Sequence, residues 1–292
     1  MLDPALLGGR TRYERVMHGW VDNLHEDALT HTVRLFDDDR GLEVAVVALP
    51  SPTYAIHEAR LTPLSGVAPS VVAGFAGLAG AALVGGLTRQ VAGLVGDAPG
   101  GALAVDATIE VGRLARQVAK MPRAQAERAA SGDPRDCWQL DTTGWVELPN
   151  SCFAYSEAGR SLFGTRTVAA QMSPDLYSPR PGQRKVFERR KVARLERVGD
   201  RLRLFHSMHD NVHGFEITYE IDLATGKVVR AEHITPRLPY MGICSEPQRR
   251  ITSLLGETAD AGLRKRIQSS LGGEHGCGQL YDLTADLLKL LA

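Results

Sequence analysis

Three features are scarce or missing in this sequence, and each excludes a class of protein. Only four cysteines occur in 292 residues, at irregular spacing, so a secreted disulfide framework is excluded and a reducing, cytoplasmic compartment is favoured. Lys plus Arg and Asp plus Glu both number 34. Without a basic surplus, we expect no nucleic-acid partner. The N-terminus also lacks the basic-then-apolar order of a signal peptide.

Charge is absent from one long stretch and locally concentrated in another. Residues 61–88 contain no charged side chain, and their length is adequate for a membrane span. They are rich in Gly and Ala and include Pro63 and Pro69, so we interpret them as a buried helix pair and expect no membrane span, with a membrane element as the alternative. The basic stretch 184–194 is interleaved with glutamate and is interpreted as the solvated face of a strand.

The sequence contains an internal repeat. Residues 41–63 align without a gap with 214–236, and after three extra residues 66–114 align with 242–290. Most identities are Gly, Leu or Pro, which set turns, helix ends and packing. The repeat therefore predicts an α+β fold made of two copies of one unit, an antiparallel hairpin or sheet followed by three helices, which together form a pseudo-dimer.

The periodicity of the second copy indicates its elements. Apolar residues alternate from Phe215 to Ile221, a turn follows, and a second strand runs from Val228 to Ile234. We expect helices at about 245–255, 259–271 and 277–291. Recurrence of Arg-Leu-Phe predicts further strands at Thr30–Phe36 and Leu202–Met208.

Three segments follow from the repeat. Residues 1–116 form a first copy without residues for chemistry, and 191–292 form the second copy, which carries the candidate site. Residues 117–190 have no counterpart. They contain a charged helix at about 118–130 and an aromatic-dotted part that is expected to add strands to the second sheet.

The differences between the copies single out four residues of the second. They are His213, Cys244, His275 and Cys277, which stand opposite Arg40, Ala68, Pro99 and Gly101. Metal ligands or nucleophiles thus occur together in one copy and are missing from the other.

These residue types point to a metal site. Cys277 starts the last predicted helix, where unpaired N–H groups lower a thiol pKa. Together with Cys244 and His213 it predicts a three-ligand zinc or iron site, with His275, Asp210 or water as the fourth partner. Two structural cysteines and a surface histidine remain the alternative, as does a metal-free Cys–His enzyme.

At His-Gly-Cys-Gly-Gln-Leu-Tyr-Asp-Leu the second copy resembles a bacterial family called domain of unknown function 2889. The family pattern is a His-Asp before a strand, a Cys after the hairpin and a late Gly-Cys-Thr-His-Leu. The matching residues are His213, Cys244, Gly276, Cys277 and Leu280. Gly214 and Gly278-Gln279 depart from it.

The order of elements is also similar to that of NifU/IscU-type iron–sulfur scaffolds, whose ligands lie at the places of His213, Cys244 and Cys277. This resemblance implies an IscU-like fold and a metal- or sulfur-handling site. The hypothesis is a metal-binding protein, as a metal-dependent hydrolase or lyase acting on a small metabolite. The alternative is an accessory subunit or a sulfur or iron–sulfur carrier without its own catalysis, whose protein partner docks on the Gly/Ala-rich helix near 70–87.

Overall fold

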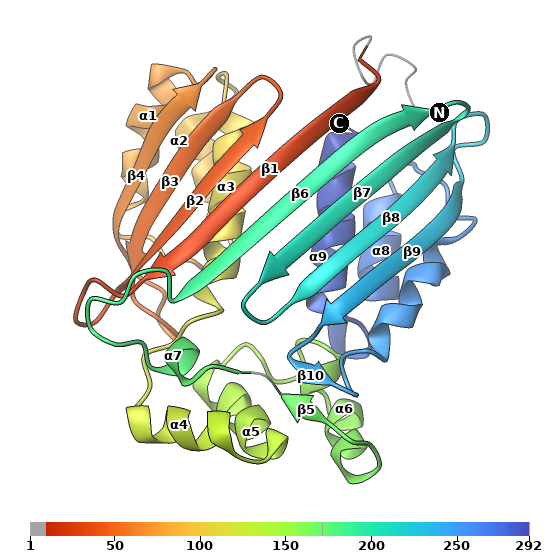
Figure 1. Ribbon diagram of the computed structural model, residues 1–292. Helices are drawn as coiled ribbons and strands as arrows, with labels where there is room; N and C mark the ends of the chain where they lie inside the picture. Colours follow the sequence, from red (N-terminus) through yellow and green to blue (C-terminus); the bar gives the residue numbers. More distant parts are fainter. Residues whose placement is uncertain (1–9, 171, 292) are drawn as a thin grey trace.

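The framework of the molecule is one eight-stranded antiparallel sheet, seen from its open face in Figure 1. The computed structural model describes residues 10–170 and 172–291. The strand order from edge to edge is β4-β3-β2-β1-β6-β7-β8-β9. The bounds are β1 Arg12–Asp22, β2 Leu29–Asp37, β3 Gly41–Ala48, β4 Ile56–Ser65, β6 Phe187–Val198, β7 Arg201–Asp210, β8 Gly214–Asp222 and β9 Val228–Arg237. In each half of the sheet the strands therefore follow chain order from the centre to the edge, from β1 to β4 in one half and from β6 to β9 in the other.

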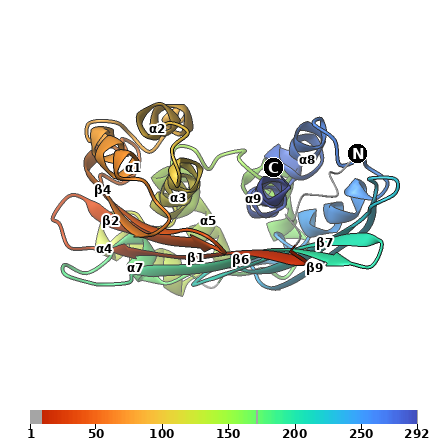
Figure 2. The same cartoon turned by 90° about the horizontal axis from the view of Figure 1, so that it is seen from above.

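Most helices cover the same face of this sheet (Figure 2). The first half supplies α1 Pro69–Phe75, α2 Leu87–Val95 and α3 Gly101–Ala115, and the second supplies α8 Leu263–Leu271 and α9 Gly278–Leu287. Short 3₁₀ helices are Ala76–Leu78, Phe153–Tyr155, Leu162–Gly164, Pro247–Leu254, Gly273–His275 and Leu288–Leu290. Helix α3 packs on β1, β2 and β3, and α9 packs on β7.

Alternation of buried and exposed side chains explains why the strands are covered on one face only. In β3, Val44, Val46 and Ala48 are fully buried, whereas the residues between them are half-buried. Successive side chains of a strand point to opposite faces. The buried set meets the helices, and the other set forms the open face.

The segment between the two halves lies beyond one end of the sheet (Figure 1). It contains α4 Arg123–Ser131, α5 Pro134–Gly144, α6 Glu157–Ser161 and α7 Pro174–Tyr177. Its strand β5, Ala169–Ala170, pairs with β10, Tyr240–Met241, in a separate two-stranded sheet.

A buried carboxylate anchors this segment to the second half. Asp141 on α5 accepts hydrogen bonds from the hydroxyls of Tyr155 at 2.8 Å and Tyr177 at 2.7 Å, and from Tyr240. Burial raises the pKa of Asp141, and the hydrogen bonds from the three hydroxyls oppose this rise without cancelling it. Since Tyr240 follows β9, this cluster joins the connecting helices to the end of the sheet.

Replacing Asp141 by Asn should destabilise the fold by about 3 kcal/mol. The amide oxygen accepts hydrogen bonds less strongly than a carboxylate, and the amide NH₂ group is a donor that would face three tyrosine hydroxyls which also donate. Urea unfolding followed by fluorescence measures this. The matched control is Asp136→Asn, an exposed position on the same helix. Equal stability of the two variants would contradict the anchoring role.

The α+β class and the strands at 214–222 and 228–234 are confirmed. The continuous helix near 70–87 is wrong, because the chain leaves the helical conformation after Leu78 and passes through a left-handed turn at Gly80, φ +85°. The solvated face at 184–194 is also wrong in part, since Arg189 and Lys191 are buried. In the described part of the chain, no helix is long and apolar enough to span a membrane.

Candidate functional site

His213, the predicted histidine ligand, lies in the turn between β7 and β8 and is held by a carboxylate. Its Nδ1 is 3.1 Å from Asp210 Oδ1, and Asp210 also accepts from the backbone N–H of Val212 and His213. Arg189 on β6 is fully buried and donates to Asp210 Oδ2 at 2.8 Å. Burial would raise the pKa of Asp210, but the charges of His213 and Arg189 hold it well below its usual range.

Electrostatic influence links the predicted cysteines to a third one. The charge of Cys277 acts on the titration of Cys152, and the charges of Cys152 and Cys277 act on that of Cys244. The backbone explains the approach, because Phe153 N–H donates to Gly276 O at 2.8 Å. Cys137 lies nearby, 3.1 Å from the hydroxyl of Tyr177.

The expected lowering of the Cys277 pKa is wrong. Cys277 is the residue at the N-terminus of α9, as predicted. Burial, however, raises its pKa and outweighs the backbone N–H of Leu280. Burial also raises the pKa of Cys152 to about 11 and that of Cys244 well above the usual range. The thiols are therefore protonated at neutral pH.

The four predicted ligands are not brought together as one metal-binding group. Across residues 10–170 and 172–291, no three His, Cys, Asp or Glu side chains form a group that could hold a metal ion. His275 is exposed and pairs only with its neighbour Glu274, at 3.4 Å. His213 is bound to Asp210. Thiol chemistry suits zinc or iron, but only Cys244 and Cys277 of the predicted set meet.

A second cluster, which we call the central cluster, lies where β1 meets β6 beneath α3 and α9. It combines four acidic and four basic side chains in a network of ion pairs. The members are Asp106, Glu110, Asp282, Asp286, Arg15, Arg113, Lys191 and Lys289. Three of the pairs join the helical segment of the first half to that of the second: Lys289–Asp106 at 2.8 Å, Arg113–Asp282 at 2.9 Å and Arg113–Asp286.

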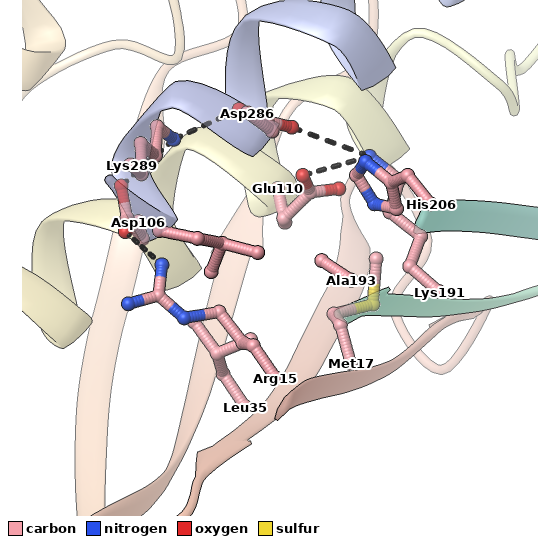
Figure 3. Close-up of a pocket in the computed structure, with 11 residues that line it drawn as sticks. Arg15, Met17, Leu35, Asp106, Glu110, Lys191, Ala193, His206, Asp286 and Lys289 are labelled. Atoms are coloured by element: carbon pink, nitrogen blue, oxygen red, sulfur yellow. Dashed lines mark hydrogen bonds and ion pairs between the residues drawn. The ribbon is translucent and has the colours of Figure 1, made fainter. Parts of the chain in front are cut away.

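A cavity of about 40 Å³ opens inside the central cluster (Figure 3). Lys191 Nζ, from β6, donates to Glu110 Oε1 at 2.8 Å. Glu110 Oε2 is buried and has no hydrogen-bond partner. His206, from β7, has Nδ1 2.9 Å from Leu283 O. Because a carbonyl only accepts, Nδ1 carries the proton and Nε2 is left as an acceptor.

Burial shifts the titration of these groups. Loss of water lowers the pKa of Lys191, although the Glu110 charge opposes this. Burial would raise the pKa of Glu110, but the charges of Lys191 and Arg113 lower it to about 2. Burial lowers the pKa of His206 to about 4. At neutral pH the cavity thus faces an ionised carboxylate and a neutral imidazole.

The cavity adjoins a larger hollow of about 1110 Å³. Arg15, Asp106, Lys289 and Leu290 line both spaces. The hollow also exposes Arg10 and Arg40, and the loop 96–101 forms one wall. The Arg15–Asp106 pair stands where the two spaces adjoin.

The sequence interpretation missed the central cluster. One signal was present, since Asp106 and Asp282 are identical at aligned positions of the last helix of each copy. That identity was taken as part of the scaffold. Lys191 was assigned to a solvated face because its neighbours along β6 are charged.

Acidification should destabilise the protein before its carboxylates titrate. His206 is neutral in the fold but takes up a proton on unfolding below its ordinary pKa of 6.5, so stability is complete above that pH and is lost as pH falls towards 4. The loss for one such residue is roughly 3 kcal/mol. Urea unfolding at several pH values measures it.

The control for this prediction is the His206→Val variant. His31 is also buried, with its pKa lowered to about 4, so the variant should lose only part of the pH dependence. A stability profile between pH 6.5 and 4.5 that is the same in both proteins would contradict the role of His206. Glu110 adds its own loss only at lower pH, because its native pKa is depressed.

One comparison with known proteins matches part of the chain. Residues 194–291, from within β6 to the C-terminal turn, match the family described as Protein of unknown function (DUF2889). The match includes His213, Cys244, Cys277, His206 and Asp286. No curated protein and no solved structure matches, so the resemblance to iron–sulfur scaffolds gains no support. The second half of the chain is thus similar to a family whose description assigns no activity.

Proposed function

We propose that the protein is an enzyme, a hydrolase or lyase in the broad sense, that transfers protons to or from a small polar molecule in the central cluster. The observation that carries the proposal is Lys191, only 4% exposed, in the lining of a cavity that Glu110 and His206 also line. Strongly perturbed titratable groups around a cavity are typical of active sites.

The register of the sheet favours a functional role over a purely structural one. Met17 and Lys191 face each other across β1 and β6. Met17 lies opposite Leu35 on β2, and Lys191 lies opposite Met208 on β7. Met17 and Lys191 thus hold corresponding places in the two halves. In the first half an apolar methionine is sufficient at this place.

The same asymmetry applies to His206. It faces Ala193 on β6, while Val33 faces Gly19 at the corresponding place on β2 and β1. Burying an amine and an imidazole costs free energy that Met and Val avoid. The second half therefore retains two costly groups at one cavity, which supports chemistry there.

The roles follow from the hydrogen bonds. Lys191, with its pKa lowered by burial, is the group that exchanges a proton with the bound molecule. Glu110 fixes the ammonium through Oε1. His206 Nε2 is an additional acceptor, held in place by Leu283 O.

The pseudo-dimer belongs to the same proposal. We infer that the halves are two copies of one unit, and the matching connectivity and crossed ion pairs support this. Aligned Asp106 and Asp282 each pair with a cation on the other helix. The site then lies at the junction of the copies and not within the second copy alone.

Replacing Lys191 by Met should lower turnover at least about 100-fold, the usual effect of losing a proton-transfer group. The assay is a panel of small esters, amides and hydroxy acids, followed by NMR. Lys185→Met, an exposed position just before β6, is the control and should retain activity.

Lys191→Met also leaves buried carboxylates without their partner, which is destabilising by itself. A double variant, Lys191→Met with Glu110→Gln, removes both charges and preserves the fold. If the folded double variant kept full turnover, the proposed role of Lys191 would be wrong. An inactive wild-type chain across the panel would favour the accessory-subunit alternative.

A second candidate function is metal binding at the thiols. It is supported by the electrostatic influence of Cys152 and Cys277 on Cys244 and by the preference of zinc and iron for thiolates. The described residues form no ready three-ligand group, so binding would have to draw the three thiols together. In this version Cys152 takes the place that the sequence gave to His213 or His275. The metal would bring folding energy and Lewis acidity when bound.

Plasma mass spectrometry of protein purified without a metal-affinity tag tests this. We expect about one zinc or iron per chain, lost in Cys277→Ala and Cys152→Ala. Cys137→Ala is the matched control, since its thiol contacts Tyr177 and not the other cysteines. A metal content that is zero, or independent of these cysteines, would exclude the thiol site.

A further inference from the structure

We propose that a groove between the helices of the two halves binds a small amphipathic anion, a carboxylate that carries a chain of several carbon atoms. The groove has a volume of about 430 Å³, within the range of small-molecule sites. Its walls come from the two groups of helices that Figure 2 shows on one face of the sheet. The inference concerns a second site and does not depend on turnover in the central cluster.

Two parallel helix faces give the groove its length. Helix α3 contributes five lining residues between Thr108 and Arg116, and α9 with the 3₁₀ turn after it contributes five between Tyr281 and Lys289. In both sets the spacing is i, i+1, i+4, i+5 and i+8, which is one face of a helix. At a rise of about 1.5 Å per residue, each face extends for about 12 Å. The groove therefore suits an elongated molecule.

The wall from the first half is apolar. Leu83 and Val84, just before α2, and Leu87, in its first turn, line the groove together with Ile109 of α3. Val84 is 43% exposed. Removing apolar surface from water contributes about 25 cal/mol per Å². An aliphatic chain lying on this wall would cover Val84 and be stabilised by its burial.

The wall from the second half offers polar groups that have no partner in the protein. Arg264, in the first turn of α8, is exposed and lines the groove. Among residues 10–170 and 172–291 its guanidinium makes no hydrogen bond or ion pair, and the same holds for the hydroxyl of Tyr281. A guanidinium donates to both oxygens of a carboxylate. The free donors of this wall thus favour an anionic head group.

The carboxylates that line the groove do not cancel this preference, because each is paired with a cation of the chain. Asp282 pairs with Arg113 at 2.9 Å, and Asp286 pairs with Lys289 at 2.9 Å. Arg264 is left without an ion pair in the part of the chain that the structure describes. A bound carboxylate would supply the missing partner while its chain contacts the apolar wall.

Calorimetry with octanoate, acetate and octylammonium tests the inference. Octanoate should bind at least about tenfold more tightly than either of the others, since acetate lacks the chain and octylammonium has the opposite charge. Arg264→Gln should remove the preference over octylammonium. Arg249→Gln is the matched control, because Arg249 is also exposed and unpaired among the described residues but does not line the groove.

A second variant fills the groove without changing its charge. A Cβ on Gly112 meets no atom closer than Arg116 Nη1, at 3.6 Å, so Gly112→Val should fold, as circular dichroism can verify, and should abolish octanoate binding. Octanoate that binds no more tightly than acetate or octylammonium, or equally well to Arg264→Gln, would overturn the inference. Binding that survives Gly112→Val in a folded protein, or no octanoate binding at all, would overturn it as well.

Discussion

The pairing of β1 with β6 is the contact on which the rest of the structure depends. It joins two four-stranded halves into one sheet, and it does so antiparallel, with Met17 opposite Lys191 near the middle. Because each half carries its last long helix over its inner strands, the pairing also places α3 and α9 on the same face, on either side of the centre of the sheet (Figure 2), where long side chains bridge them. The crossed ion pairs of the central cluster follow from that approach.

The acidic and basic side chains of the central cluster are equal in number, but this equality by itself does not show that the cluster stabilises the fold. Replacing a buried ion pair by apolar side chains is often neutral, whereas removing one partner is strongly destabilising. The network therefore fixes how the halves meet more than it strengthens the fold. Among the described residues, two of its members keep a buried atom without a hydrogen-bond partner, Glu110 Oε2 and Arg15 Nε.

The sequence predicted those parts of the fold whose pattern is local. Alternation revealed β8 and β9, and the glycines before Cys277 revealed the start of α9. For β6 a strand was expected, but the burial of Arg189 and Lys191 was not, because charged residues interrupt its hydrophobic alternation. No local pattern shows that such charges find partners on a distant helix.

The candidate site was predictable only in part, for a related reason. The comparison of the copies identified Cys244 and Cys277, which do meet, but pairing by alignment says nothing about the connecting segment that supplies Cys152. It also overlooked Lys191, since the repeat alignment began at residue 41 and did not include β1 or β6. Differences between copies are informative only where the alignment extends.

Two different residues can face each other across the centre of the sheet in a single chain, but not across the axis of a symmetric dimer of identical chains. On the proposal that the halves are copies, the two-fold axis passes between Met17 and Lys191, and a symmetric dimer would place the same residue on both sides of it. Two lysines there would repel each other, and two methionines would carry no proton. Joining the copies allows one of each, so the cavity gains a lysine that is buried and still tolerated. On the proposed function, the asymmetry at this one contact, more than the loss of cysteines from the first half, would fit the chain for chemistry at its centre.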